Sequence, residues 1–339
     1  MSPKVVGTTS FGLQSMPTNG FLRTSANLAP ETEAWVKWRK EETYYAVGQL
    51  AEQLYAPEGL KILKWQRAIP KLLAALWVIQ QRHRQQLSRI RKLNVSLACL
   101  LPPGEYESRH LLHQAIEQID SFETPTGMVQ VGLKQFECYP ECAGVLGLFQ
   151  QQVTSASKTL AFIMMGYRNA SLLVVRHGKL SMMLSSDLGF VRCTERVQEH
   201  SCGLEISALL PAMAEAAKTR NAVPYLNIVP YLEPPLKEQN ARQLVELVEQ
   251  AKTAYFHQLS QWLDEYIPLT EQPSLVFCGG TAETMQAQLN QYQPHLPHYY
   301  SSNLALADEL ERISTKNRAR ILDVCGTFEI QFARSVLAS

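Results

Sequence analysis

The chain has 339 residues, enough for about two domains and for a core that buries roughly three quarters of the unfolded surface. It contains 32 Lys and Arg against 31 Asp and Glu, so its charges nearly cancel. The length argues against a disordered chain, and the charge balance excludes a domain-wide basic field and argues against direct binding to nucleic acid or to an acidic membrane surface.

Cysteine usage and hydropathy indicate a cytoplasmic protein. The seven cysteines are an odd number, and Cys99 and Cys278 lie within apolar, strand-like runs. Cys138 and Cys142 share a short spacing, but no second Cys or His pair accompanies them, so a structural zinc site is not favoured. The longest apolar run, 72–79, is far shorter than the ~20 residues that span a bilayer, and the N-terminus has no signal-peptide core.

The first half of the chain alternates strands and helices. Residues 34–46 predict two short strands around a charged turn, and 60–82 carry apolar residues at helical spacing. Residues 94–101 are an apolar run stopped by Pro-Pro-Gly, which is typical of a buried strand. A helix over 108–122 and a strand over 128–136 follow. This order predicts an α/β layer.

The second half begins after a helical stretch that reaches about Ser157, and we place the domain boundary near Gln150. LAFIMMG predicts a strand, and SLLVVRHGKLSMML predicts a hairpin that turns at His177 and Gly178. The apolar residues of 236–267 recur at three- and four-residue steps, which predicts one long helix. The segment ILDVCGTFEIQFARSVLA predicts a terminal helix.

The most informative unit is an apolar strand, SLVFC, that runs directly into Gly279, Gly280 and Thr281 and then into a helix. Two glycines at such a turn permit positive φ and close approach of a ligand to the backbone, and the helix start offers free N–H groups. We expect Gly280 to need this freedom. A tight connection that binds nothing explains the same residues equally well.

Several strings in one order carry a family resemblance. They are TYYAVGQLA, LKWQRAIPKLLAALWVI, LLPPGEYESR, PECAG, GYRNASLLVVRHGKL, SSDLGF, CGGTAE and ARILDVCGTF. Together they resemble the actin-like ATPases of the ParM/StbA plasmid-segregation type, in a branch common in cyanobacteria. The resemblance covers nearly the whole chain from about Ser2. LLPPGEYE and GYRNAS are the more specific strings, whereas CGGTAE is shared by the wider superfamily of actin, sugar kinases and Hsp70.

The resemblance implies an α/β fold of two actin-like domains facing a nucleotide cleft. The first domain covers residues 1–150, the second covers 151–320, and a C-terminal helix over 321–339 returns to the first. The implied ligand is ATP or another purine nucleotide with Mg²⁺. The implied partners are further copies of the chain, in a filament or oligomer, and an adaptor protein bound to DNA.

The resemblance also assigns roles to individual residues. Glu141 matches the polar residue that orients the attacking water, although a helix-capping or solvated glutamate explains it equally well. The residues that match nucleotide contacts belong to the second phosphate loop, the turn after the second hairpin and the adenosine turn: Gly166, Asn169, Ser171, Asp187, Gly189, Gly279, Gly280 and Thr281. No residue is assigned as a direct metal ligand.

Two departures from the family pattern weaken the expected ATPase. The first phosphate loop should be an Asp-Gly-rich hairpin, and nothing like it precedes Lys4, so Met1 looks like an internal methionine of a longer ancestral frame. Met164 stands where the superfamily places a carboxylate that holds the water shell of Mg²⁺ through hard oxygen ligands. We therefore expect very slow hydrolysis or none.

Two other functions remain open. One is a degenerate, non-hydrolysing scaffold that keeps the two-domain shape for protein interaction. The other is a small-molecule kinase of the same superfamily, for which the sequence shows no substrate-binding motif. The histidine pairs His110/His113 and His295/His298 lack a third metal ligand, and no serine has the surroundings of a hydrolase nucleophile.

Overall fold

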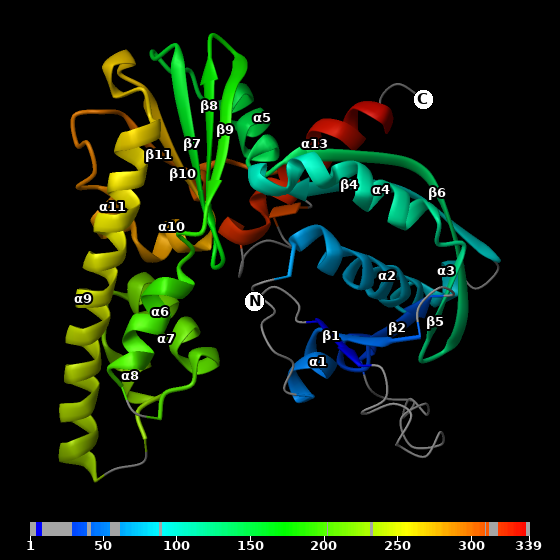
Figure 1. Ribbon diagram of the computed structural model, residues 1–339, viewed down its shortest axis with the longest axis horizontal. Coiled ribbons are helices and arrows are strands. Elements are labelled where there is room, and N and C mark those ends of the chain that lie inside the picture. Colours follow the sequence, from blue (N-terminus) through cyan, green and yellow to red (C-terminus); the bar gives the residue numbers. More distant parts are fainter. Residues whose placement is uncertain are drawn as a thin grey trace. The chain divides into compact units, whose positions relative to one another are not determined.

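The computed structural model describes residues 5–8, 29–38, 42–54, 62–87, 90–201, 203–230, 233–308, 310–311 and 318–336. Contacts between Cα atoms divide the chain into unit 1, residues 1–101 and 105–139, and unit 2, residues 102–104 and 140–339. The change of unit falls at Pro140, whereas the sequence placed the boundary near Gln150. Each unit contains one sheet covered by helices (Figure 1).

The sheet of unit 1 has the strand order β1-β3-β2-β5-β6-β4. Its strands are β1 (Val5–Thr8), β2 (Trp35–Trp38), β3 (Tyr44–Val47), β4 (Lys92–Leu101), β5 (Ser121–Thr124) and β6 (Gly127–Pro140). The pair predicted over 34–46 is confirmed, with Trp35 opposite Ala46 in an antiparallel register. The first phosphate loop, expected before Lys4, falls outside the described residues.

The helices of unit 1 are α1 (Gln49–Gln53), α2 (Lys64–Arg82), α3 (Arg84–Leu87) and α4 (Arg109–Glu117). Two 3₁₀ turns, η1 (Pro30–Thr32) and η2 (Pro103–Ser108), lie among them in the chain. The helix predicted over 108–122 ends early because residues 121–124 form a strand. There Phe122 pairs with Val129 and is buried, and its neighbours in the strand alternate between more and less buried, with the period of two that a strand imposes.

The sheet of unit 2 has the order β11-β10-β7-β8-β9. Its strands are β7 (Thr159–Met165), β8 (Ala170–Arg176), β9 (Lys179–Ser186), β10 (Ser274–Cys278) and β11 (His298–Tyr300). β10 runs parallel to β7 and β11, and β8 runs antiparallel to both neighbours. The predicted hairpin is confirmed, because His177 and Gly178 both have positive φ at its turn.

The helices of unit 2 are α5 (Ala143–Gln152), α6 (Val191–Glu199), α7 (Ile206–Thr219), α8 (Val223–Leu226), α9 (Pro234–Tyr266), α10 (Gly280–Thr284), α11 (Gln286–Leu289) and α13 (Arg318–Val336). Short 3₁₀ turns are η3 (Leu269–Glu271) and η4 (Ser301–Asn303). The long helix and the terminal helix are both confirmed. α13 packs against α5, and both helices belong to unit 2. Most of α5 lies within residues 1–150, which the sequence assigned to the first domain, and the return of the terminal helix to that domain stays a prediction.

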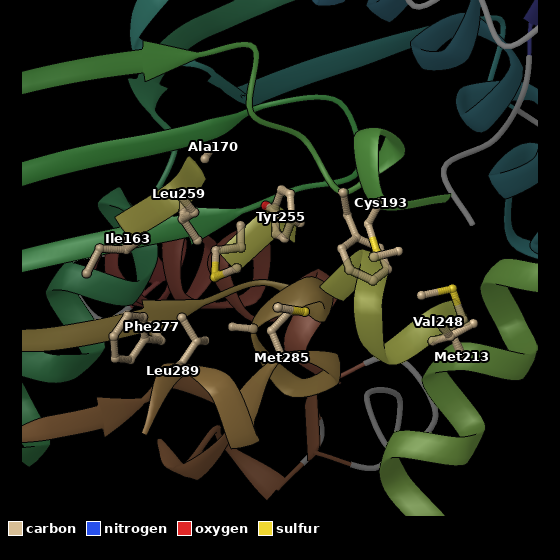
Figure 2. Close-up of a cluster of buried hydrophobic side chains, with 14 of the residues drawn as sticks. Ile163, Ala170, Cys193, Met213, Val248, Tyr255, Leu259, Phe277, Met285 and Leu289 are labelled. Atoms are coloured by element: carbon tan, nitrogen blue, oxygen red, sulfur yellow. The ribbon is translucent and has the colours of Figure 1, made fainter. Parts of the chain in front are cut away.

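Both faces of the unit 2 sheet are buried, and its central strands are accordingly mostly apolar. On one face, Ile163 and Phe277 join side chains of α6, α7, α9 and α11 in a large cluster (Figure 2). On the other face, Phe162 and Val276 pack with residues of α5 and α13. Neighbouring strand residues point to opposite faces, and this alternation splits each strand between the two cores.

α5 and α13 pack closely against each other at Gly144 of α5. A Cβ built on Gly144 would lie 1.9 Å from the carbonyl oxygen of Asp323 and 2.5 Å from the backbone nitrogen of Thr327. No side chain fits in that space. Gly144 therefore lets the backbones of two helices meet, and it brings the start of α5 against the middle of α13.

Candidate functional site

A row of four side chains crosses the unit 2 sheet where the strands end. Direct register pairs join Cys278 to Met164, Met164 to Ser171, and Ser171 to Ser185. Paired residues on neighbouring strands share a face, and Cys278 and Met164 belong to the core formed with α5 and α13. We call Cys278, Met164, Ser171 and Ser185 the cross-sheet row.

Ser171 lies at the centre of a hydrogen-bond network. Its hydroxyl donates to Oε2 of Glu141 at 3.3 Å and lies 3.1 Å from the hydroxyl of Ser185. The side-chain amide of Asn169 donates to the same Ser171 oxygen at 3.2 Å, and the backbone N–H of Gly104 donates to Ser185 at 3.1 Å. The structure thus brings three of the predicted residues, Glu141, Asn169 and Ser171, into one contact network.

Glu141 occupies the turn between β6 and α5, at the edge of a helix N-terminus that already holds an anion. The carboxylate of Asp323, on α13, accepts the backbone N–H groups of Cys142, Gly144 and Val145 at 2.7, 2.9 and 3.1 Å. Burial raises the pKa of Asp323 to about 6. The free N–H groups and the positive dipole end of α5 are therefore satisfied by the protein itself.

The turn predicted to contact phosphates, residues 166–169, is held from two sides. Within it, the N–H of Gly166 donates to the carbonyl of Asn169 at 3.0 Å. The N–H of Phe190, which precedes α6, donates to the carbonyl of Gly166, and a Cβ on Gly189 would lie 2.1 Å from the backbone of Arg168. Gly189 therefore permits close packing of the α6 start against this turn.

Two polar groups near this turn differ in their surroundings. The Oδ1 atom of Asn169 is buried and has no hydrogen-bond partner among the described residues. Asp187 is exposed and forms an ion pair with Arg192, whose Nε also donates to the Asp187 carbonyl at 3.1 Å. Asn169 thus offers an acceptor inside the network, whereas Asp187 serves to anchor the first turn of α6.

The first glycine of the turn after β10 is required by its positive φ and by the short distance to neighbouring atoms. Gly279 has φ +89°, and a Cβ there would lie 2.5 Å from the carbonyl oxygen of Met165 and 3.1 Å from Sδ of Met164. The expectation that Gly280 adopts positive φ was wrong, because the unusual torsion belongs to Gly279. At Gly280 the nearest atoms are Cγ and Nε of Arg320, both 3.1 Å from a built Cβ.

Charged side chains surround the start of α10, which begins at Gly280. Desolvation raises the pKa of Glu283, and the positive charges of Lys218, Arg320 and Arg318 oppose that rise. The third predicted residue of the turn, Thr281, is buried. This side of the site combines a glycine backbone with cationic and carboxylate groups that can recognise a polar organic ligand.

Local sequence patterns could not reveal three residues of this site. Ser185 reaches Ser171 only through strand register, and Asp323 and Arg320 come from a helix near the end of the chain. The string SSDLGF, which contains Ser185, contributes to the family resemblance but does not single that serine out. Long-range contacts of this kind carry no signal in the spacing of neighbouring residues.

Comparison with solved structures shows the fold. Bacillus thuringiensis ParM with ATP is 11% identical, with 91% of this chain and 88% of that chain covered and a TM-score of 0.55. The archaeal actin homologue Ta0583 is 14% identical, with coverage of 98% and 91% and a TM-score of 0.58. The Alp12 filament structure is 12% identical, with coverage of 89% and 84% and a TM-score of 0.50.

No model of a known protein family and no curated protein matches the sequence. Within the described residues, no helix is long and apolar enough to cross a membrane. The agreement with ParM and the archaeal homologue extends over most of each chain, so it concerns the whole fold and not one shared motif. The chain has the α/β, actin-like fold of the ParM type.

Proposed function

We propose that unit 2 binds a purine nucleotide, with ATP as the first candidate, and that the chain self-associates in a nucleotide-dependent manner. The observation that carries this proposal is the Gly279–Gly280 turn at the end of β10, next to the cross-sheet row and its contact to Glu141. In this actin-like fold, the glycine turn offers a backbone surface for the nucleoside, and Glu141 offers a carboxylate near the terminal phosphate.

The nucleoside would lie against the glycine turn. Gly279 keeps side-chain atoms away from the backbone of Met165, and the charged groups beside Gly280 suit the polar edges of a base and a ribose. The long side chain of Arg320, which passes over Gly280, supplies a planar cation that can stack on a base or pair with phosphate. Thr281 extends this surface into the first turn of α10.

The phosphates would face the turn at residues 166–169 and the start of α6. Gly166 and Gly189 allow the backbone to pack closely there, and Asn169 points its side chain into the same network. Asp187 would act through its ion pair with Arg192, which fixes the turn after the second hairpin. Glu141 is our candidate for orienting the attacking water.

The residues do not fit a dedicated Mg²⁺ site. No group of three or more His, Cys, Asp or Glu side chains that could hold a metal occurs among the described residues. The cross-sheet row presents a thiol, a thioether and two hydroxyls, and Met164 supplies a soft sulfur where Mg²⁺ requires oxygen. Mg²⁺ would therefore have to arrive with the nucleotide phosphates.

Assembly into a filament or oligomer is the second part of the proposal. Its support is the resemblance to Alp12, which was solved as a filament, and to ParM, which was solved with ATP. In the function we propose, the assembled chain segregates plasmid or other DNA through an adaptor protein bound to that DNA. Direct contact with DNA is not part of the proposal, because the charges nearly cancel.

Met164 favours one alternative, a degenerate actin-like scaffold that binds partner proteins without hydrolysing ATP. The thioether is half-buried against the Gly279 turn and cannot hold a water shell as a carboxylate does. If the scaffold is correct, the chain assembles or binds partners equally well with and without nucleotide.

Calorimetric titration with ATP and ADP tests the nucleotide site. We expect measurable binding, weakened at least about tenfold by Arg320→Ala, since a hydrogen bond to a charged group contributes about 1.5–3 kcal/mol and about 1.4 kcal/mol is a tenfold change. Arg242→Ala is the matched control, because Arg242 is exposed on α9 and pairs only weakly with Glu238. A folded wild-type protein that binds neither nucleotide would refute the proposal.

A further inference from the structure

All the hydrogen-bonding positions of the Ser171 hydroxyl are occupied. Ser171 is fully buried, and a serine hydroxyl offers one hydrogen and two lone pairs. Its hydrogen goes to Glu141, and Asn169 donates to one lone pair. Ser185 donates to the other: the single hydrogen of Ser171 goes to Glu141, so the bond between the two hydroxyls must use the hydrogen of Ser185, whose own oxygen accepts the N–H of Gly104.

These bonds form a chain with a single consistent direction. Donation runs from the N–H of Gly104 to Ser185, from Ser185 to Ser171, and from Ser171 to Oε2 of Glu141. Each hydroxyl both accepts and donates, so every bond polarises the next toward the carboxylate. A phosphate oxygen needs donors, and Ser171 has no hydrogen left to give it.

We propose that Ser171 is a positioning residue, which fixes the carboxylate of Glu141 for the attacking water instead of contacting phosphate. The inference rests on the proposed function, because it requires a nucleotide at this site. Ser171 lies on β8, which pairs with β7 on one side and β9 on the other, whereas Glu141 lies on a turn. A rigid central strand thus orients a side chain that comes from a turn.

In the reaction, the water oxygen bonds to the terminal phosphorus, and the bond to the nucleoside diphosphate breaks with its electron pair. The proton of the water passes to solvent by way of the carboxylate. The Ser171 proton is not consumed, because the hydroxyl only holds Oε2. Misorientation of a catalytic group by about 1 Å lowers a rate by about a hundredfold, so loss of this bond should slow phosphate release.

The test measures ATP binding and single-turnover phosphate release, with protein in excess over radiolabelled ATP. We expect Ser171→Ala to lower the rate about 10- to 100-fold while ATP affinity stays within about threefold. Ser171→Thr, which keeps the hydroxyl, should retain most of the rate. The double variant of Ser171→Ala and Glu141→Gln should be no slower than Glu141→Gln alone, because both changes remove one function.

Ser181→Ala is the control, since Ser181 lies on the same hairpin and bonds to Val174 and Arg176, away from the row. Thermal melts of each variant identify loss of folding, and the threonine variant tests the hydroxyl if alanine unfolds the chain. A rate unchanged by Ser171→Ala, or a tenfold loss of ATP affinity, would overturn the inference. The inference would also be overturned if the wild-type protein bound ATP but released phosphate no faster than the Glu141→Gln variant. That result would leave the proposed nucleotide site unaffected. Absence of ATP binding overturns both proposals.

Discussion

Replacing Asp323 by alanine should strongly destabilise unit 2, because it removes the group that caps α5. The carboxylate is buried and accepts three backbone N–H groups at the start of that helix, and alanine leaves all three without a partner. Each unsatisfied buried donor costs about 1–3 kcal/mol. Partial entry of water reduces the sum, so we expect a loss of about 3–5 kcal/mol, the range found when one partner of a buried charged contact is removed.

Hydrogen exchange of the α5 amides, together with urea unfolding, measures this loss. Protection of the Gly144 and Val145 amides should fall in Asp323→Ala. Asp264→Ala is a suitable control, because Asp264 is exposed on α9 and accepts hydrogen bonds from Tyr292 and Gln293. We expect the control to cost less, about 1–2 kcal/mol, because water can replace the exposed carboxylate as an acceptor. If Asp323→Ala were no more destabilising than Asp264→Ala, the capping role assigned to Asp323 would be wrong.

The same carboxyl gives unit 2 a pH dependence of defined sign. Burial raises the pKa of Asp323 from 3.8 to about 6, although the N–H groups of Cys142, Val145 and Gly144 oppose the rise. The folded protein then binds this proton more tightly than the unfolded chain. Its free energy of unfolding should therefore decrease from pH 4 to pH 6 and be level above that range. Asp323→Asn should lack this slope, and equal slopes in the two proteins would contradict the assignment.

Three further predictions concern the glycine turn and the sulfur groups. Gly279→Ala should lower the free energy of unfolding by about 2–4 kcal/mol in unfolding titrations, because alanine there combines a positive φ with a clash against Met165. Gly178→Ala should lower it by only about 1 kcal/mol, because no atom beyond its chain neighbours lies within 4 Å of a Cβ built at Gly178. Equal losses in the two variants would refute this prediction. Met164→Leu should leave the ATP affinity unchanged, both with and without EDTA, because the thioether only packs and binds no Mg²⁺. If EDTA changed the ATP affinity of the two proteins differently, Met164 would take part in Mg²⁺ binding. The Cys142 thiol is fully buried and its pKa is raised by burial, so iodoacetamide at pH 8 should label it only after unfolding, as peptide mapping would reveal.

Elements with a strong local period could be predicted from the sequence. The apolar steps of 236–267 match α9 closely, and the glycine turn after SLVFC occurs where strand and helix patterns meet. The hairpin at His177 was equally clear, since two apolar strands flank a short polar turn. In these segments, the pattern of neighbouring residues was sufficient to predict the element.

The candidate site depends on contacts that local patterns do not encode. Ser171 was expected to touch phosphate, but no pattern in the sequence indicated its contacts with Glu141, Asn169 and Ser185, which reach it through strand register and a turn. Asp323 caps a helix that begins far earlier in the chain. The helix over 108–122 was overextended because the strand at 121–124 is defined by its pairing with β6.

High-speed pelleting with ATP, with ADP and without nucleotide, followed by electron microscopy of the pellets, tests the central claim most directly. We predict that ATP drives the protein into the pellet as ordered filaments or oligomers and that Arg320→Ala raises the ATP concentration required. Equal pelleting under all three conditions, by a protein that binds neither nucleotide, would contradict nucleotide-dependent assembly and would favour the scaffold.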